Sequence, residues 1–179
     1  DRQAKPSGKY VGNNNYHEFF GDNRDVRSWA FWMTQWMSQV NRLVKSGGYA
    51  MVFTDWRQLP TLTDVFQAGG LIPWDKTLST RAPHTGYFRH QCEYVVWGSN
   101  GPLPKSLHGG PWPGMVTRRV IPSQKLHMTG KPIELMESLV APVPPGGHIL
   151  DPFMGSASTG VAALRKGYKF TGIEMSQQY

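Results

Sequence analysis

Apolar residues recur at intervals of three and four along one early stretch of the chain, between residues 25 and 44. The positions are Trp29, Trp32, Met33, Trp36, Met37, Val40, Leu43 and Val44. This spacing places the apolar side chains on one face of a helix. We therefore predict an amphipathic helix that starts at Asp25 and ends before the pair Gly47 and Gly48.

Shorter apolar runs bounded by turn residues follow. Residues 49–54 (YAMVFT) fit a buried strand, and residues 71–78 and 90–98 fit two more strands. Between the first two runs, residues 59–68 predict a helix that two glycines close. The alternation of helix and strand predicts an α/β sheet.

The second half of the chain begins with residues 99–130, which are dense in Gly and Pro and predict a long connection without regular structure. Residues 132–140 then predict a helix with proline in its first turn. Residues 149–174 (ILDPFMGSASTGVAALRKGYKFTGIE) read as a strand, a glycine-containing turn, a short helix and a second strand. Residues 1–23 lack periodicity and predict a loop or mobile arm.

The length and composition limit the classes of protein. At 179 residues the chain has the usual length of one domain, and its net charge of +7 favours a polyanionic partner or simply a basic surface. A single cysteine, Cys92, excludes an intrachain disulfide framework and a zinc site built on several thiolates, and the six histidines lack metal-ligand spacing. With no apolar run of membrane length and no signal peptide, we expect a soluble, intracellular protein without metal.

The strand at 149–151 ends in a carboxylate at the turn. Asp151 lies at the carboxyl edge of the predicted sheet, where ligands bind in such folds, and Gly155 allows backbone to approach a ligand closely. Glu174 ends the next strand, where an acid can accept hydrogen bonds from two ribose hydroxyls. The turn lacks the G-x-G-x-x-G pattern, and Asp151 would repel a pyrophosphate. A cationic, nucleoside-containing cofactor fits better than NAD, while an ordinary strand-turn-helix crossover stays open.

A second motif upstream of the turn changes this picture. The segment His127 to Val140 (HMTGKPIELMESLV) followed by DPFMGSAST resembles the amino-group DNA methyltransferases, which methylate the exocyclic nitrogen of adenine or cytosine. The matching residues are Thr129, Lys131, Pro132 and Leu135 in a T-x-K-P segment and its helix, then Asp151, Pro152, Phe153, Gly155, Ser156 and Thr159 in a D-P-F-x-G turn, and Glu174 as the ribose-binding acid. Two motifs in this order make a specific signal.

The resemblance implies a fold, a cofactor and an order of parts. The fold is the Rossmann-like S-adenosylmethionine-dependent methyltransferase fold, α/β with a mostly parallel sheet and an antiparallel hairpin strand. All of the matched residues except Leu135 would bind S-adenosylmethionine, with S-adenosylhomocysteine as product. The motif order is that of the family's beta-type members, and the wording is most similar to phage and prophage DNA methylases. Residues 1–179 form one domain, with a mobile arm (1–24), a catalytic half (25–98), the long loop (99–130) and a cofactor-binding half (131–179).

One motif of the family is absent from the chain. The catalytic tetrapeptide Asp/Asn/Ser-Pro-Pro-Tyr/Phe/Trp should precede the first helix, and no such sequence occurs among the 179 residues. We expect it upstream of Asp1 in the parent protein. Its polar side chain and backbone carbonyl accept hydrogen bonds from the target amino group, and its ring stacks on a flipped base. No catalytic residue is therefore assigned within the chain.

Candidate contacts to nucleic acid lie in two loops. In residues 80–90, Arg81 and Arg89 could bind phosphate while Tyr87 and Phe88 stack on bases, or the two rings could lie in the core. Arg118, Arg119 and Lys125 in the long connection could grip phosphates or be merely solvated. Asp55 and Trp56 follow a buried strand at the edge where the substrate should lie. The alternative is that Asp55 caps a helix and that the Trp56 indole lies in the core.

Together these features favour a DNA methyltransferase acting at adenine N6, in the cytoplasm of a bacterial or phage-infected cell. Since only residues 99–130 are available for a recognition region, we expect a short or relaxed sequence preference. Methylation of cytosine N4 or of RNA, and an inactive nucleic-acid-binding module with the same fold, are the alternatives. A nucleotide-dependent dehydrogenase is a weaker one, and the oligomeric state stays open.

Overall fold

The structure is a computed structural model, and it describes residues 24–80, 84–121 and 130–176. The predicted arm lies outside these residues apart from Arg24. The elements in chain order are α1 (Val26–Leu43), β1 (Tyr49–Thr54), α2 (Leu59–Val65), β2 (Gly70–Asp75), the 3-10 helix η2 (Thr77–Ser79), β3 (Cys92–Ser99), β4 (Val116–Thr117), α3 (Ile133–Val140), β5 (His148–Asp151), α4 (Ser158–Arg165) and β6 (Lys169–Gly172). The predicted α/β class is confirmed.

The strands form two sheets in the part of the chain that the structure describes. The larger has the order β1-β3-β2-β4, and the smaller pairs β5 with β6 in parallel. Strand β3 lies between β1 and β2 and runs antiparallel to both, with Thr54 opposite Tyr94 and Trp74 opposite Glu93. The larger sheet is therefore mixed: β1, β2 and β4 run in one direction and β3 runs opposite to them, in agreement with the predicted antiparallel hairpin strand in an otherwise parallel sheet.

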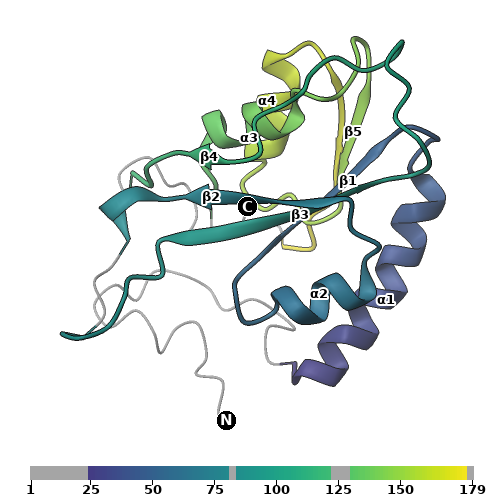
Figure 1. Cartoon of the computed structure of the whole chain (residues 1–179). Coiled ribbons are helices and arrows are strands. Elements are labelled where there is room, and N and C mark those ends of the chain that lie inside the picture. The colour runs from purple at the N-terminus through teal and green to yellow at the C-terminus, as the bar shows by residue number, and fades with distance from the viewer. Residues whose placement is uncertain (1–23, 81–83, 122–129, 177–179) are drawn as a thin grey trace.

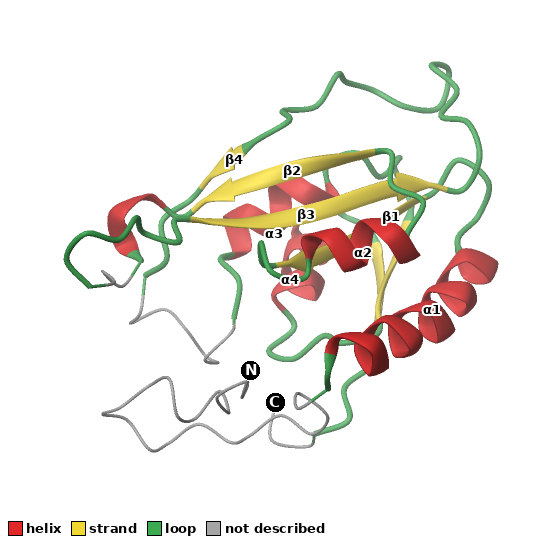
Figure 2. Ribbon diagram, turned by 60° about the horizontal axis from the view of Figure 1, so that its bottom comes forward, coloured by secondary structure: helices red, strands yellow, loops and turns green. Residues whose placement is uncertain are grey.

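Helices cover both faces of the larger sheet, with α3 and α4 on one face and α1 and α2 on the other (Figure 1). Alternating residues of β1 serve the two faces, as the two-residue period of a strand requires. Met51 and Phe53 pack in the cluster that contains Leu135 of α3, whereas Ala50 and Val52 pack against Met33 of α1. The second view shows α1 and α2 together on their side of the sheet (Figure 2).

The two sheets share one apolar core. Ile149 of β5 packs in the same cluster as Phe53 of β1, Trp74 of β2 and Leu135 of α3. Helix α3 is amphipathic and buries Leu135, Met136, Leu139 and Val140 against both sheets. The glycine turn between β5 and α4 is thereby fixed relative to the hairpin strands.

The ends of the helices have local causes. Asp25 caps α1, because its carboxylate accepts hydrogen bonds from the backbone N–H groups of Arg27 and Ser28. Helix α2 ends at Val65, three residues earlier than predicted, because the backbone of Phe66 turns to an extended conformation and its side chain is buried. Leu62 is fully buried beneath it.

The prediction that residues 99–130 lack regular structure is wrong at one point. Val116 and Thr117 form the short strand β4, which pairs in parallel with Trp74 and Asp75 at the end of β2. Burial of the Val116 side chain stabilises this pairing. Two residues carry no periodic signal, so the pattern could not predict the strand. None of the helices in the described ranges is long and apolar enough to cross a membrane.

Candidate functional site

The carboxylate of Asp151 ties the end of β5 to the turn that follows it. Its Oδ1 accepts a hydrogen bond from the Phe153 backbone N–H at 3.0 Å, and its Oδ2 accepts one from the Thr159 hydroxyl at 2.6 Å. The first bond closes an Asx turn, and the second anchors the first turn of α4. Asp151 and Thr159, both predicted as cofactor contacts, are thus brought together by a hydrogen bond that shapes the turn itself.

Gly155 and Glu174 meet although 19 positions separate them. The Gly155 N–H donates to Glu174 Oε2 at 2.9 Å, while Oε1 accepts from the Ser176 N–H at 2.9 Å. The parallel pairing of Asp151 with Gly172 brings the carboxyl ends of β5 and β6 to one edge, where folds of this class bind ligands. Gly155 has φ +47, and a Cβ at this position would meet no atom within 4 Å. The turn is therefore open on the side of Gly155.

Two residues near the turn have unusual backbone or packing. Ala157, at the start of α4, has φ +58 in the left-handed region that non-glycine residues rarely adopt. Gly160 packs so closely on Phe170 that a Cβ would lie 2.6 Å from the ring. Pro152 and Ser156 are half-buried within the turn. Phe170 of β6 therefore packs directly against the start of α4, next to the turn.

Helix α1 contacts the turn through aromatic rings. The ring of Phe153, which is 55% exposed, lies 5.6 Å from the Trp32 ring and 5.3 Å from the Trp36 ring between centroids. The Arg24 guanidinium lies 5.3 Å from the Trp32 ring on the same helix side. The sequence placed both indoles on the apolar stripe, and nothing in that pattern signalled a contact with Phe153.

Lys131 lies directly before α3, whose N-terminal cap is Pro132. Its ammonium lies 3.9 Å from Glu93 Oε2 and 5.0 Å from the centre of the Phe53 ring. Glu93 Oε1 accepts a hydrogen bond from Lys76 at 3.0 Å. Burial lowers the pKa of Lys131, the Glu93 carboxylate raises it and the nearby Lys76 lowers it, with a net lowering. Thr129 lies outside the described residues.

Glu93 was missed from the sequence because its role depends on register. Its side chain lies on the same face of β3 as Val95, two residues further on, and thus faces the α3 side of the sheet. Through Lys131 it connects the hairpin strand to the segment just before α3. A lone acid in an otherwise apolar strand, between Cys92 and Tyr94, was the available signal.

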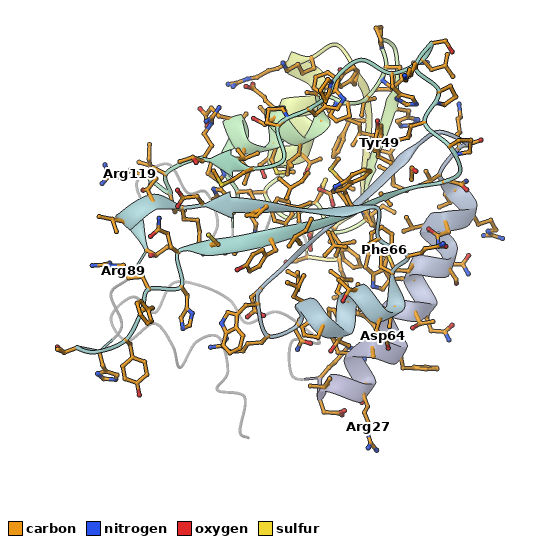
Figure 3. The ribbon with its side chains drawn as sticks, in the orientation of Figure 1. Arg27, Tyr49, Asp64, Phe66, Arg89 and Arg119 are labelled. Atoms are coloured by element: carbon orange, nitrogen blue, oxygen red, sulfur yellow. The ribbon has the colours of Figure 1, made fainter. Side chains whose placement is uncertain are left out.

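The predicted base-contacting rings lie at the surface. Phe88 is 96% exposed and Tyr87 is 72% exposed, so the alternative that they lie in the core is wrong. The Arg89 guanidinium donates to the Thr80 carbonyl at 2.7 Å. Figure 3 shows Arg89 at the end of the sheet from which the connection between β2 and β3 projects. Arg81 lies outside the described residues.

Trp56 and Asp55 follow β1 in the turn before α2. Asp55 Oδ1 accepts from the N–H groups of Arg57 and Gln58, which is the capping role. Trp56 is exposed and not a core indole; its ring stacks on that of His90 with centroids 5.9 Å apart and planes 19° from parallel. The Arg57 guanidinium lies 5.3 Å from the Trp56 ring.

Arg118 and Arg119 are exposed just after β4. The backbone carbonyl of Arg118 accepts a hydrogen bond from the Trp74 indole at 2.9 Å, and its guanidinium donates to the Thr117 carbonyl at 2.7 Å. The Arg119 side chain projects at the same end of the sheet as Arg89 in Figure 3. Lys125 lies outside the described residues.

In the described residues, neither a candidate metal centre nor the best-formed pocket coincides with the glycine turn. Across residues 24–80, 84–121 and 130–176, no group of three or more His, Cys, Asp or Glu side chains could hold a metal ion. A cavity of about 180 Å³ lies between β1, β2 and α3, with Met51, Ile72, Val116 and Leu139 in its wall. No residue of the turn lines it, so the open surface at Gly155 is the better candidate for a ligand.

A mixed sheet covered by helices on both faces, beside two parallel strands joined through a glycine turn and a helix, defines a Rossmann-like α/β protein. The family whose members are described as DNA methylases matches residues 8–179. The chain belongs to this family of amino-group DNA methyltransferases, and the resemblance seen in the sequence is confirmed.

Individual relatives are similar over parts of the chain. It is 35% identical over 124 residues to the type II methyltransferase M2.DpnII of Streptococcus pneumoniae. This match covers 60% of this chain and 46% of that protein. It is 36% identical over 93 residues to the DNA adenine methyltransferase YhdJ of Escherichia coli (strain K12), covering 50% of this chain and 32% of that one. The chain spans 46% to 65% of the length of the first three curated relatives.

Solved structures share the fold. The complex of M1.HpyAVI with SAM superposes with a TM-score of 0.72 at 22% identity, covering 83% of this chain and 78% of that one. The cytosine-N4-specific PvuII DNA methyltransferase superposes with a TM-score of 0.69 at 18% identity, covering 92% of this chain and 72% of that one. The predicted Rossmann-like methyltransferase fold is thereby confirmed.

Proposed function

We propose that this protein transfers a methyl group from S-adenosylmethionine to the exocyclic N6 of adenine in DNA. The observation that carries the proposal is the hydrogen bond between Gly155 and Glu174, which brings a ribose-binding type of acid to an open glycine turn at the carboxyl edge of two parallel strands. Membership of the DNA methylase family supports the reaction class. The M1.HpyAVI structure, a complex with SAM, supports the cofactor.

The residues of the turn fit this cofactor. Open space beside Gly155 leaves room for a ligand against the backbone, and the exposed face of Phe153 offers an apolar surface. The Glu174 carboxylate accepts one backbone N–H at each oxygen, and an ionised carboxylate has about four acceptor positions, so two remain for ribose hydroxyls. When bound, the cofactor supplies a methyl group on a positively charged sulfur.

The charge of the site suits a cationic ligand. Asp151 and Glu174 lie at the same edge, and both carboxylates are bound by N–H or O–H donors of the turn or of the chain just after β6. A pyrophosphate near these two acids would be repelled, which disfavours a dinucleotide cofactor. Further contacts to the cofactor would come from Pro152, Ser156, Lys131, Pro132 and Thr129.

Adenine is the base that we propose, with cytosine as the second candidate. YhdJ is named a DNA adenine methyltransferase and is 36% identical over the matched segment, which favours adenine N6. The PvuII enzyme is named cytosine-N4-specific and shares the fold, which keeps N4 methylation as the alternative. In both reactions an exocyclic amino nitrogen takes the methyl group from the sulfonium sulfur and loses a proton, so the residues of this chain could serve either.

Catalysis in this proposal depends on positioning and exclusion of water, without a covalent intermediate. The family's tetrapeptide would accept hydrogen bonds from the amino group, and we place it outside this sequence, upstream of Asp1. Residues 25–98 would form the catalytic half and residues 131–179 the cofactor half. Arg89, Arg118 and Arg119 would contact phosphates, together with Arg81. The protein would act on DNA in the cytoplasm of a bacterial or phage-infected cell.

The first experiment measures cofactor binding by isothermal titration with S-adenosylhomocysteine. Glu174→Gln is expected to weaken binding about tenfold or more, because a hydrogen bond to a charged group is lost. Glu134→Gln, which removes an exposed acid of α3, is the matched control and should leave the affinity unchanged. Equal affinity of Glu174→Gln and the unaltered chain would refute the placement of the ribose at Glu174.

The second experiment identifies the base. DNA is incubated with S-adenosylmethionine carrying a labelled methyl group, digested to nucleosides, and the labelled nucleoside is identified. Label in N6-methyladenine supports the proposal, and label in N4-methylcytosine replaces it with the alternative. Cofactor binding without transfer, for a protein that includes the tetrapeptide, would favour an inactive nucleic-acid-binding module. Transfer spread over many sequence contexts would support the short or relaxed preference expected from the 99–130 loop.

A further inference from the structure

The connection between β2 and β3 projects beyond the sheet and exposes large apolar side chains. It is the teal segment that extends furthest from the helices in Figure 1, and the short helix η2 lies at its start (Figure 2). Leu78, Tyr87 and Phe88 are all exposed, and Phe88 has 96% of its surface in contact with solvent. A benzyl side chain left in water loses the free energy that burial would give, so its position is unfavourable for folding alone.

The base of this connection is firmly built. The Lys76 N–H donates to the Gln91 carbonyl at 3.0 Å, and the Gln91 side-chain amide donates to Asp75 Oδ1 at 2.7 Å. Further out, the Arg89 guanidinium donates to the Thr80 carbonyl at 2.7 Å. These bonds join the outgoing and returning strands, so Phe88 is presented from a braced loop next to Arg89.

The charge of the segment indicates the kind of partner. From Lys76 to Cys92 the sequence contains lysine, arginine and histidine but no aspartate or glutamate. The neighbouring turn after β1 adds a second group of ring and cation, in which Trp56 lies beside His90 and Arg57. Rings interleaved with cations are the composition of surfaces that bind single-stranded nucleic acid, where bases stack on rings and phosphates meet cations.

We propose that Phe88 stacks on an unpaired base of the bound DNA, with Arg89 beside it at the backbone. This deepens the proposed function, since it rests on DNA as the substrate and names the residue that contacts a base. An amino group inside a duplex must leave the stack before it reaches a methyl donor, and an exposed ring at the substrate edge stabilises the unstacked bases. Stacking of a base on an aromatic ring contributes about tenfold or more in affinity.

The test separates contact with bases from contact with phosphates. Binding of the whole chain is measured by fluorescence anisotropy, with a labelled DNA strand of mixed sequence and about 16 nucleotides and with an abasic strand of the same length and charge. The unaltered chain is expected to prefer the strand with bases. Phe88→Ala should weaken binding to that strand about tenfold and leave binding to the abasic strand within a factor of about two. Phe88→Trp should retain the preference.

A matched control uses another exposed ring far along the chain. Phe31 on α1 is 68% exposed, and Phe31→Ala should leave binding to both strands unchanged. Because Phe88 is at the surface, Phe88→Ala should also unfold at the same temperature as the unaltered chain. Equal weakening on both strands, no weakening, or absence of any preference for bases would overturn the proposal. So would a change of oligomeric state on Phe88→Ala without a change in DNA binding.

The failure of this inference can be distinguished from failure of the proposed function. S-adenosylhomocysteine binding is measured on the same preparations and does not involve Phe88. Cofactor binding with no discrimination between the strands removes the role of Phe88 and leaves the methyltransferase proposal. Base-dependent binding lost in Phe88→Ala, with no cofactor binding by the unaltered chain, supports the inference and contradicts the cofactor site.

Discussion

Lys131 lies 3.9 Å from Glu93 and thereby joins the segment before α3 to the central strand β3. The Lys131 side chain is 24% exposed, and its ammonium also faces the Phe53 ring at 5.0 Å. Glu93 shares its carboxylate with Lys76, so one acid stands between two cations. The contact connects the central hairpin strand to the segment just before α3.

The lowered pKa of Lys131 makes stability depend on pH in the alkaline range. Burial disfavours the charged form of Lys131 and lowers its pKa in the folded chain. At pH values between this lowered pKa and the ordinary pKa of about 10.4, the unfolded chain therefore binds more protons than the folded chain. The free energy of unfolding due to this group therefore rises with pH through that window. Lys131→Met should lose this rise, so the stability of the variant relative to the unaltered chain should fall as pH increases from neutral.

Urea unfolding followed by tryptophan fluorescence at neutral and alkaline pH measures this difference. The exposed Lys169 gives a matched control, since Lys169→Met removes one positive charge at the surface of β6. A constant difference between Lys131→Met and the unaltered chain at every pH would contradict the prediction.

Asp75 predicts a rise of stability with pH as well, but in the acid range. Its pKa is lowered, first by the hydrogen bond from the Gln91 side chain and then by the one from the Thr77 N–H. The stability that it contributes is present above the ordinary pKa of aspartate and is lost as pH falls through the folded pKa. Asp75→Ala should lower the melting temperature at neutral pH and have less effect near pH about 3, below the ordinary value. Thermal unfolding at the two pH values tests this, and equal shifts at both would contradict it.

Local patterns predicted the elements of this fold well. The stripe that begins at Trp29 predicted α1, and residues 49–54 are the strand β1. The predicted strand, turn, helix and strand of residues 149–174 correspond to β5, α4 and β6. These features depend on residues close in sequence or on a motif whose order is fixed. Each is therefore visible in the sequence before any tertiary contact is known.

Contacts between distant elements could not be predicted in the same way. Glu93 meets Lys131 only because β3 lies between β1 and β2, and strand order is not encoded in the period of any one strand. Trp32 and Trp36 lie on the apolar face of α1, as expected of residues that pack in the core. The helical pattern does not indicate that these two indoles contact Phe153. The sequence likewise could not decide whether the Phe88 side chain is exposed. A loop has no periodic pattern of apolar positions from which burial can be predicted.

The left-handed backbone of Ala157 predicts that glycine is the more stable residue there. A residue with a Cβ costs about 1–2 kcal/mol in this conformation, and glycine adopts it freely. Ala157→Gly should therefore raise the free energy of unfolding by about 1 kcal/mol. The same exchange inside α4, Ala162→Gly, should lower it by about 1 kcal/mol or more, because helix propensity and buried contact are both lost. Urea unfolding of the pair checks the signs, and destabilisation by both exchanges would show that the turn tolerates Ala157 without strain.

The short hydrogen bond from Thr159 to Asp151 predicts that one hydroxyl affects both stability and the proposed cofactor site. Thr159→Val keeps the shape of the side chain but removes the donor, so Asp151 Oδ2 loses a half-buried partner. The free energy of unfolding should fall by about 1–2 kcal/mol, as expected for a hydrogen bond to a charged group near the surface. Because the same carboxylate holds the Phe153 N–H, the turn should also loosen and S-adenosylhomocysteine should bind more weakly. Thr159→Ser retains the hydroxyl and should preserve the affinity even if it unfolds somewhat earlier. Titration calorimetry and urea unfolding on the three proteins separate the effects. Loss of affinity in the serine variant, with full affinity in the valine variant, would assign the role to the methyl group of Thr159 and not to its hydrogen bond.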